Sequence, residues 1–262
     1  MEHRNTNRTL MRGLDLLRAV SSTDMPTVTN LAKLTGLPKS TTSRFLAVLV
    51  QEGYLRIDVD QRFCLAPKVL ELGFSALQGL GVSEVVAAPL QDIADVCNGA
   101  ANLGELDGTD VIMIARRTAR TQRERFYSMN IHIGTRLPAL YTATGRVLLA
   151  QQPAVLQQAL DRCEQDRLTP TSTVDRAVLT AQVEEGGITG AIRIRNELAP
   201  GFGAVAIAVQ INPQRTIALS GSYLLADHDE GIEDRVEAML RTQAPTIASL
   251  MSVHGSLPAA RK

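Results

Sequence analysis

The chain has 262 residues, 45% of them hydrophobic, which is enough for a packed core and about two domains. Lysine plus arginine equals aspartate plus glutamate at 27 each, so the net charge indicates no polyanionic partner. The sequence shows neither a signal-peptide core nor an apolar run of about 18 residues. This pattern argues against a secreted or membrane protein and predicts a cytoplasmic one.

Cysteine and histidine spacing gives no indication of a metal or catalytic centre. Cys64, Cys97 and Cys163 are too far apart for a zinc finger and too few for a disulfide framework, so we expect free thiols. The four histidines also lie apart from one another, without carboxylate or cysteine neighbours at ligand spacing. We therefore expect no metal ion, no cofactor and no catalytic residue.

The first segment of the chain predicts two helices. Apolar residues recur at helical spacing over Arg8 to Ser21 and over the shorter stretch Asn30 to Thr35. Either Thr27 or Thr29 can cap the second helix, and Gly36 ends it. Residues 1–46 contain seven basic and three acidic side chains, so this segment is locally positive although the chain is neutral.

A third helix is predicted from Lys39 to Glu52, after a tight turn at Leu37-Pro38. Its apolar stripe comprises Thr42, Phe45, Leu46, Leu49 and Val50. After this helix, Tyr54 to Ile57 and Arg62 to Leu65 alternate as strands around a polar turn, which predicts a hairpin. Three helices followed by a hairpin are typical of a winged helix-turn-helix domain.

The remainder of the chain predicts a larger α+β domain. Residues Pro67 to Leu80 read as a linker helix and Ser83 to Cys97 as the first helix of the second domain. Strands are predicted over Ala101–Leu106, Val111–Arg116, Arg125–Met129, Ile188–Ile194, Gly203–Gln210 and Thr216–Ser222. Helices are predicted over Ala143–Gln151, twice more by Leu168, and over Val174–Glu185 and Gly231–Ser252. We expect domains at 1–66 and 83–254, joined by the linker 67–82 and followed by a tail at 255–262.

The polar front of the third helix predicts DNA binding. A helix-turn-helix inserts the amino end of its second helix into the major groove, where hydroxyl and basic side chains reach base edges and phosphates. The alternative to DNA binding is a small helical subdomain that only packs against its neighbours. The residues predicted to contact DNA are Lys39, Ser40, Thr41, Ser43 and Arg44 on the helix and Arg62 on the hairpin.

Several motifs resemble those of the IclR family of bacterial transcription regulators. In the first domain these are "RGLDLLRAV", "LAKLTGLPKSTTSRFLAVLVQEGYL" and "RFCLAPKVLELG". In the second domain they are "VIMIARR", "IGTRLPALYTATGRVLLA" and "ELAPGFGAVAIAV". The resemblance extends over nearly the whole chain, and the "GTRLPALYTATGRVLLA" block is most similar to regulators of aromatic-acid catabolism, such as the protocatechuate and hydroxybenzoate regulators.

This resemblance implies a homodimer or homotetramer that binds double-stranded operator DNA, controlled by a small organic acid in a GAF-like effector domain. Apolar walls with few polar anchors favour an aromatic acid. Thr144, Ser220 and backbone N–H groups near Ala143 are expected to hold its carboxylate. The resemblance places the effector pocket at Phe126, Met129, Leu137, Ala143, Thr144, Phe202, Ala204 and Ser220.

Some positions depart from the family pattern. Ile194 stands where relatives usually have an acidic residue, and either the flanking pair Arg193 and Arg195 or the isoleucines could face the pocket. Thr42 replaces a commoner aliphatic residue, and Cys64 stands where the wing often has a base.

The arginine-rich segment 115–125 is expected to be a solvated loop whose first arginine can contribute to a ligand or subunit contact. Two other functions remain open at this point. One is a DNA-binding architectural protein without a ligand. The other is a small-molecule enzyme or sensor whose front end binds protein.

Overall fold

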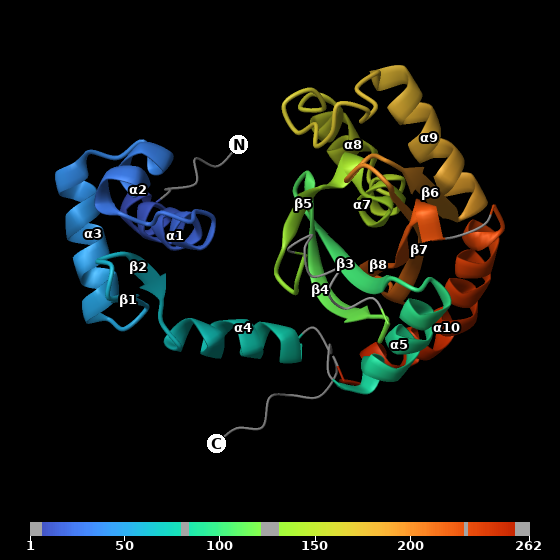
Figure 1. Ribbon diagram of the computed structural model, residues 1–262, viewed down its shortest axis with the longest axis horizontal. Helices are drawn as coiled ribbons and strands as arrows, with labels where there is room; N and C mark the ends of the chain where they lie inside the picture. Colours follow the sequence, from blue (N-terminus) through green and yellow to red (C-terminus); the bar gives the residue numbers. More distant parts are fainter. Residues whose placement is uncertain (1–6, 80–83, 122–130, 228–229, 255–262) are drawn as a thin grey trace. The chain divides into compact units, whose positions relative to one another are not determined.

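The computed structural model describes residues 7–79, 84–121, 131–227 and 230–254. Two compact units divide the chain, Met1–Ala76 and Leu77–Lys262, and each is described by itself. Figure 1 shows a small helical unit with a hairpin and a larger unit built around a sheet.

Three helices form the core of the first unit: α1 (Arg8–Ser21), α2 (Val28–Thr35) and α3 (Lys39–Gln51). Of the two predicted caps for α2, Thr27 accepts a hydrogen bond from the Asn30 backbone N–H. Gly36 ends the helix with a φ of 67°, a left-handed conformation that glycine adopts without strain. The apolar faces meet in a core that includes Leu16, Leu31, Leu46 and Leu55, each at most 2% exposed.

A two-stranded antiparallel hairpin follows, β1 (Leu55–Ile57) and β2 (Phe63–Leu65). The Asp58 carboxylate closes its turn by accepting hydrogen bonds from the backbone N–H groups of Asp60 and Arg62, both at 2.9 Å. The helix α4 (Lys68–Gly79) comes next. Lys68, the first residue of α4, contacts the first unit: its Nζ donates a hydrogen bond to the Glu52 carbonyl and lies over the Tyr54 ring.

A six-stranded sheet forms the centre of the second unit, in the order β5-β4-β3-β8-β7-β6, and every neighbouring pair is antiparallel. Its strands are β3 (Ala100–Asp107), β4 (Asp110–Thr118), β5 (Arg136–Pro138), β6 (Ala191–Arg195), β7 (Phe202–Asn212) and β8 (Arg215–Leu224). This all-antiparallel sheet with helices on both faces confirms the predicted α+β class.

The residue alternation of β7 explains how helices cover both faces of the sheet. Its large residues Val205, Ile207 and Val209 pack in the core beneath α5 (Ala87–Val96) and α10 (Ile232–His254). The short helix η1 (Glu84–Val86) comes directly before α5. Its alanines, among them Ala204 and Ala206, lie on the opposite face beneath α7. Because alanines occupy this face of β7, α7 can approach the sheet closely.

The second face is covered by α7 (Ala143–Leu149), α8 (Pro153–Leu160) and α9 (Arg176–Thr189), with the short helix η2 (Ala139–Tyr141) before α7. The short helix η3 (Leu225–Asp227) follows β8, and its Leu225 packs against the core on the side of α5 and α10. Figure 1 shows α5 and α10 side by side on one side of the sheet and α7, α8 and α9 on the other. Every residue of α7 is buried, so this short helix packs between the sheet and α8 and α9.

Two secondary-structure predictions are wrong, and one strand was missed. The strand predicted from Ile188 begins only at Ala191, because α9 continues to Thr189 and ends at Gly190 with a φ of 74°. One helix, α8, and a series of turns replace the two helices predicted by Leu168. The short edge strand β5 was not predicted, since three residues give too little alternation to detect. The strand predicted over Arg125–Met129 lies outside the described residues.

Candidate functional site

The amino end of α3 presents a polar surface. Lys39, Ser40, Ser43 and Arg44 are exposed, as predicted, and Thr41 is half-buried. Thr42 is fully buried, and its hydroxyl donates a hydrogen bond to the Pro38 carbonyl at 3.1 Å, so it lies on the core side of the helix. The polar and buried faces of α3 therefore separate where the sequence pattern predicted.

The hairpin places Arg62, half-buried, at the end of the turn that Asp58 organises. Hydrogen bonds from backbone N–H groups, first of all that of Arg62, hold the pKa of Asp58 below its ordinary value. The carboxylate also lies 3.7 Å from the Cys64 thiol. Cys64 thus helps to order the hairpin turn.

The second unit contains a mostly apolar pocket between the sheet and α7, with a cavity volume of about 40 Å³. Six of the eight residues predicted to bind the effector line it: Leu137, Ala143, Thr144, Phe202, Ala204 and Ser220. The other two, Phe126 and Met129, lie outside the described residues. The pocket therefore brings together predicted residues from β5, α7, β7 and β8.

Four polar side chains that line the pocket form a row, three of them on adjacent strands and one on α7. Strand register places Asn102 on β3 directly opposite both Arg116 on β4 and Ser220 on β8. Arg116 Nη1 donates to Asn102 Oδ1 at 2.5 Å, and Asn102 Nδ2 donates to Ser220 Oγ at 3.4 Å. Thr144 Oγ1 on α7 donates to the same serine oxygen at 3.0 Å. We call Arg116, Asn102, Ser220 and Thr144 the polar row.

A missing side chain lets α7 reach the polar row. A Cβ on Gly104 of β3 would lie 2.5 Å from the Thr144 methyl group, which is closer than two non-bonded carbon atoms approach one another. Because position 104 is glycine, Thr144 comes near enough to bond Ser220. The Thr142 hydroxyl caps α7 by accepting from the Gly145 backbone N–H at 2.8 Å.

The structure decides which side of β6 faces the pocket. Ile194 lines it, whereas Arg193 and Arg195 point away and pair with acidic residues of α10, including Glu233 and Glu237. Of the two alternatives left open by the sequence, the one in which Arg193 and Arg195 face the pocket is therefore wrong. The arginine on the pocket wall is Arg116.

The sequence did not single out Asn102 as a pocket residue, although a polar residue within the apolar run "AANLG" was a detectable anomaly. Arg116 was predicted as the last residue of a strand and the first arginine of the loop segment, where it can contribute to a ligand or subunit contact. It is half-buried within β4, which continues two residues further, to Thr118. Arg123 and Arg125 of the same cluster lie outside the described residues.

Three features bear on the other functions considered. Across the residues that the structure describes, no group of three or more histidine, cysteine or acidic side chains is arranged to hold a metal ion. Cys97 is fully buried, and burial raises the pKa of its thiol to about 12. No helix within the described ranges has the length and apolar character needed to cross a bilayer.

Comparison with known families identifies both units. The IclR helix-turn-helix domain model matches residues 9–58, and the model of the bacterial transcriptional regulator IclR C-terminal domain matches residues 74–249. The chain belongs to the IclR family. It is accordingly an IclR-type transcriptional regulator with an amino-terminal helix-turn-helix and a carboxy-terminal effector domain.

Two relatives of this IclR-family regulator are similar over most of their length. The Pca regulon regulatory protein of Pseudomonas putida is 30% identical over 202 residues, which cover 76% of this chain and 68% of the relative. The Pca operon regulatory protein of Acinetobacter baylyi is also 30% identical over 202 residues, covering 71% and 72%. Its relatives are thus transcriptional regulators, including regulators of aromatic catabolism.

Solved structures of the family share the fold. An IclR transcriptional regulator from Alicyclobacillus acidocaldarius matches with a TM-score of 0.77 at 23% identity, covering 94% of this chain and 99% of that one. An IclR homologue from Microbacterium hydrocarbonoxydans, complexed with 4-hydroxybenzoate, matches with a TM-score of 0.73 at 18% identity, covering 94% and 98%. These likenesses confirm the two-domain α+β architecture.

Proposed function

We propose that α3 reads operator DNA through its exposed amino end. Ser40, Ser43 and Arg44 stand on the exposed face where a helix-turn-helix meets base edges, with Lys39 and Thr41 beside them. Arg62 on the hairpin adds a phosphate contact from the wing. Because its partner is the bacterial chromosome, the protein acts in the cytoplasm.

The protein responds to a small organic acid with an aromatic ring. The observation that supports this proposal is an apolar pocket whose polar row has an arginine at one end. A guanidinium has five N–H donors in a planar fork, so Arg116 can hold Asn102 and a carboxylate together. Leu137, Ile194 and Phe202 supply apolar walls that suit a ring.

The proposed site residues comprise Leu137, Ala143, Thr144, Phe202, Ala204 and Ser220, with Arg116 and Asn102 added and Phe126 and Met129 retained from the family pattern. Similarity to the Pca regulators and to a 4-hydroxybenzoate-bound homologue supports an aromatic acid as the effector class. In place of the carboxylate site expected from the sequence at Thr144 and Ser220, we place the carboxylate at Arg116 and the other end of the ring over these two hydroxyl groups.

The active form is a dimer or tetramer. Two copies of α3 must face two half-sites of a palindromic operator about one helical turn apart, or a multiple of it. Helix α4 supplies an unpartnered apolar surface for a second copy, because Leu70, Leu72 and Phe74 are 72%, 61% and 63% exposed. A second chain that covers these side chains would remove them from water.

One titration tests both parts of the proposal. Fluorescence anisotropy measures binding to the DNA upstream of the protein's own gene, at two salt concentrations and with a panel of aromatic and short-chain acids. We expect salt-dependent binding that an aromatic acid alters, because only a ligand with different affinity for the two states shifts their populations. If the protein binds the operator but no acid changes its affinity, the proposed acid effector is contradicted, whereas the proposal that α3 binds operator DNA is not.

Two variants assign the sites in the same assay. Arg44→Ala should weaken sequence-specific binding by roughly five- to 150-fold, because a good base contact contributes roughly 1–3 kcal/mol of discrimination. Arg116→Gln should bind operator normally but need at least about tenfold more acid for the same response. Arg176→Ala, an exposed arginine of the effector unit, is the matched control and should change neither affinity.

A further inference from the structure

Asn102 has a fixed orientation within the polar row. Its side chain is 5% exposed, and its two ends contact Arg116 Nη1 at 2.5 Å and Ser220 Oγ at 3.4 Å. A guanidinium only donates hydrogen bonds, so the amide atom that faces Arg116 must be the oxygen. The amide nitrogen therefore faces Ser220 and donates to it.

This orientation determines what the Ser220 hydroxyl can offer. A hydroxyl has one proton to donate and accepts through two lone pairs. Ser220 Oγ already accepts from Asn102 Nδ2 and from Thr144 Oγ1. Among the described residues no acceptor receives its proton, and the side chain lines the pocket. At this point the pocket presents a hydrogen-bond donor.

We propose that Asn102 is a specificity-determining residue that fixes the hydrogen-bond polarity of the effector pocket. The effector atom over Ser220 is then a hydrogen-bond acceptor, and a group that only donates is rejected. The rejection is physical, since two donors facing each other leave both unpaired in a buried site. This inference rests on the proposed acid effector and adds a chemical requirement for the end opposite its carboxylate.

Replacing Asn102 by aspartate reverses the polarity without changing the side-chain shape. A carboxylate accepts hydrogen bonds at both oxygens, so it would accept from Arg116 and from Ser220. The serine proton would then point to residue 102, and one serine lone pair would open toward the effector. The variant pocket would accept from the effector instead of donating to it.

Isothermal titration calorimetry with two probes of similar size tests this reversal. The hydroxyl of 4-hydroxybenzoate accepts hydrogen bonds, whereas the amine of 4-aminobenzoate donates them and accepts poorly. Wild-type protein should bind 4-hydroxybenzoate about tenfold more tightly or better. In Asn102→Asp this ratio should fall to one or below. Both probes have the same carboxylate, so any change in the charge near Arg116 affects both and cancels in the ratio.

Ser220→Ala provides a second, smaller change that decides the question if Asn102→Asp does not fold. Without the serine donor the two probes should bind with nearly equal affinity. The proposed role of Asn102 would be overturned if wild-type protein bound the two probes equally well, or if either variant kept the wild-type ratio of affinities. Neither result would contradict the proposed acid effector. If neither probe binds wild-type protein, the aromatic-acid proposal fails and this inference fails with it.

Discussion

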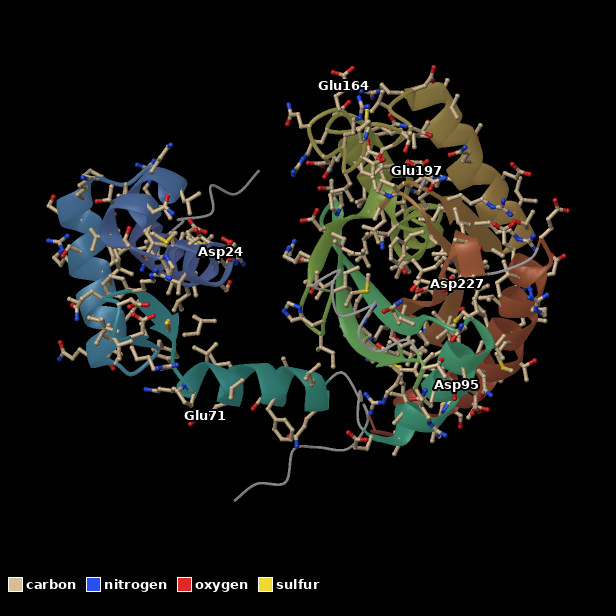
Figure 2. All side chains as sticks on the ribbon, viewed as in Figure 1. Asp24, Glu71, Asp95, Glu164, Glu197 and Asp227 are labelled. Atoms are coloured by element: carbon tan, nitrogen blue, oxygen red, sulfur yellow. The ribbon has the colours of Figure 1, made fainter. Side chains whose placement is uncertain are left out.

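Arg146 and Glu197 form a buried ion pair behind the pocket, with side chains 2% and 7% exposed and a distance of 2.9 Å (Figure 2 labels Glu197). Arg146 also donates to the Leu140 carbonyl and to Gln182 of α9. Arg146→Leu would leave a buried carboxylate without its countercharge, at a cost of roughly 3–5 kcal/mol in the free energy of unfolding. Urea unfolding followed by circular dichroism measures this loss.

The control for that prediction is an exposed pair of the same chemistry. Arg176 contacts Asp161 at 2.8 Å with side chains 52% and 67% exposed, so Arg176→Leu should change stability by less than about 1 kcal/mol. Equal losses in the two variants would mean that burial does not distinguish the pairs.

Acid stability depends in part on Glu237 of α10. Burial raises the pKa of this carboxyl, but hydrogen bonds from Arg193 and Arg241 lower it more, so its pKa falls below the usual 4.5. A carboxyl with a lowered pKa contributes stability that is present above pH 4.5 and lost as the pH falls through the folded-state value. Thermal melts from pH 7 to pH 3 should therefore show a shallower acid loss for Glu237→Gln. Glu184→Gln, at an exposed position, should keep the wild-type slope.

Helix α7 depends on a close backbone approach at Gly145. A Cβ at this position would lie 2.3 Å from both the Cα and the carbonyl oxygen of Ala139, which are backbone atoms that cannot rotate away. Gly145→Ala should displace α7 from the sheet, lower the melting temperature of the effector unit by several degrees and weaken acid binding. Calorimetry measures both changes.

Gly73 of α4 offers the matched substitution in an open helix. Apart from its two chain neighbours and the backbone of its own helix, no atom of the described residues lies within 4 Å of where its Cβ would be, so Gly73→Ala should be neutral or stabilising by up to about 1 kcal/mol. A loss of stability in Gly73→Ala as large as in Gly145→Ala would show that the close contact with Ala139 is not the cause of the loss.

The proposed oligomer depends on the apolar surface of α4. Leu70→Glu together with Phe74→Glu should yield monomers in sedimentation velocity, because the charges would be buried without partners in the proposed interface. Operator affinity should fall at least about tenfold with the loss of the second half-site contact. Gln78→Glu adds a charge to the same helix without removing apolar surface and should leave both properties unchanged.

Local pattern was sufficient for most of the helix-turn-helix unit. The stripe that ends in Leu46 and the cap at Thr27 are encoded within single helices, so both could be predicted without knowing the rest of the chain. The boundary at Gly190 was missed for the opposite reason. Alternation around Ile188 fits a strand, but that side chain is 87% exposed, and the helix continues because Gly186 and Gly187 let α9 pack closely against Ile192 and Ala150.

The sequence by itself determined the chemistry of this protein: a polar, positively charged helix front, an apolar effector domain and the motifs of its family. The tertiary structure decided which side chains meet. Asn102, Arg116 and Ser220 lie far apart along the chain and become neighbours through the register of three antiparallel strands. It also turned Arg193 outward to α10 and Ile194 inward. Alternation along a strand separates its two faces, but only the helices packed on each face decide which one borders the pocket.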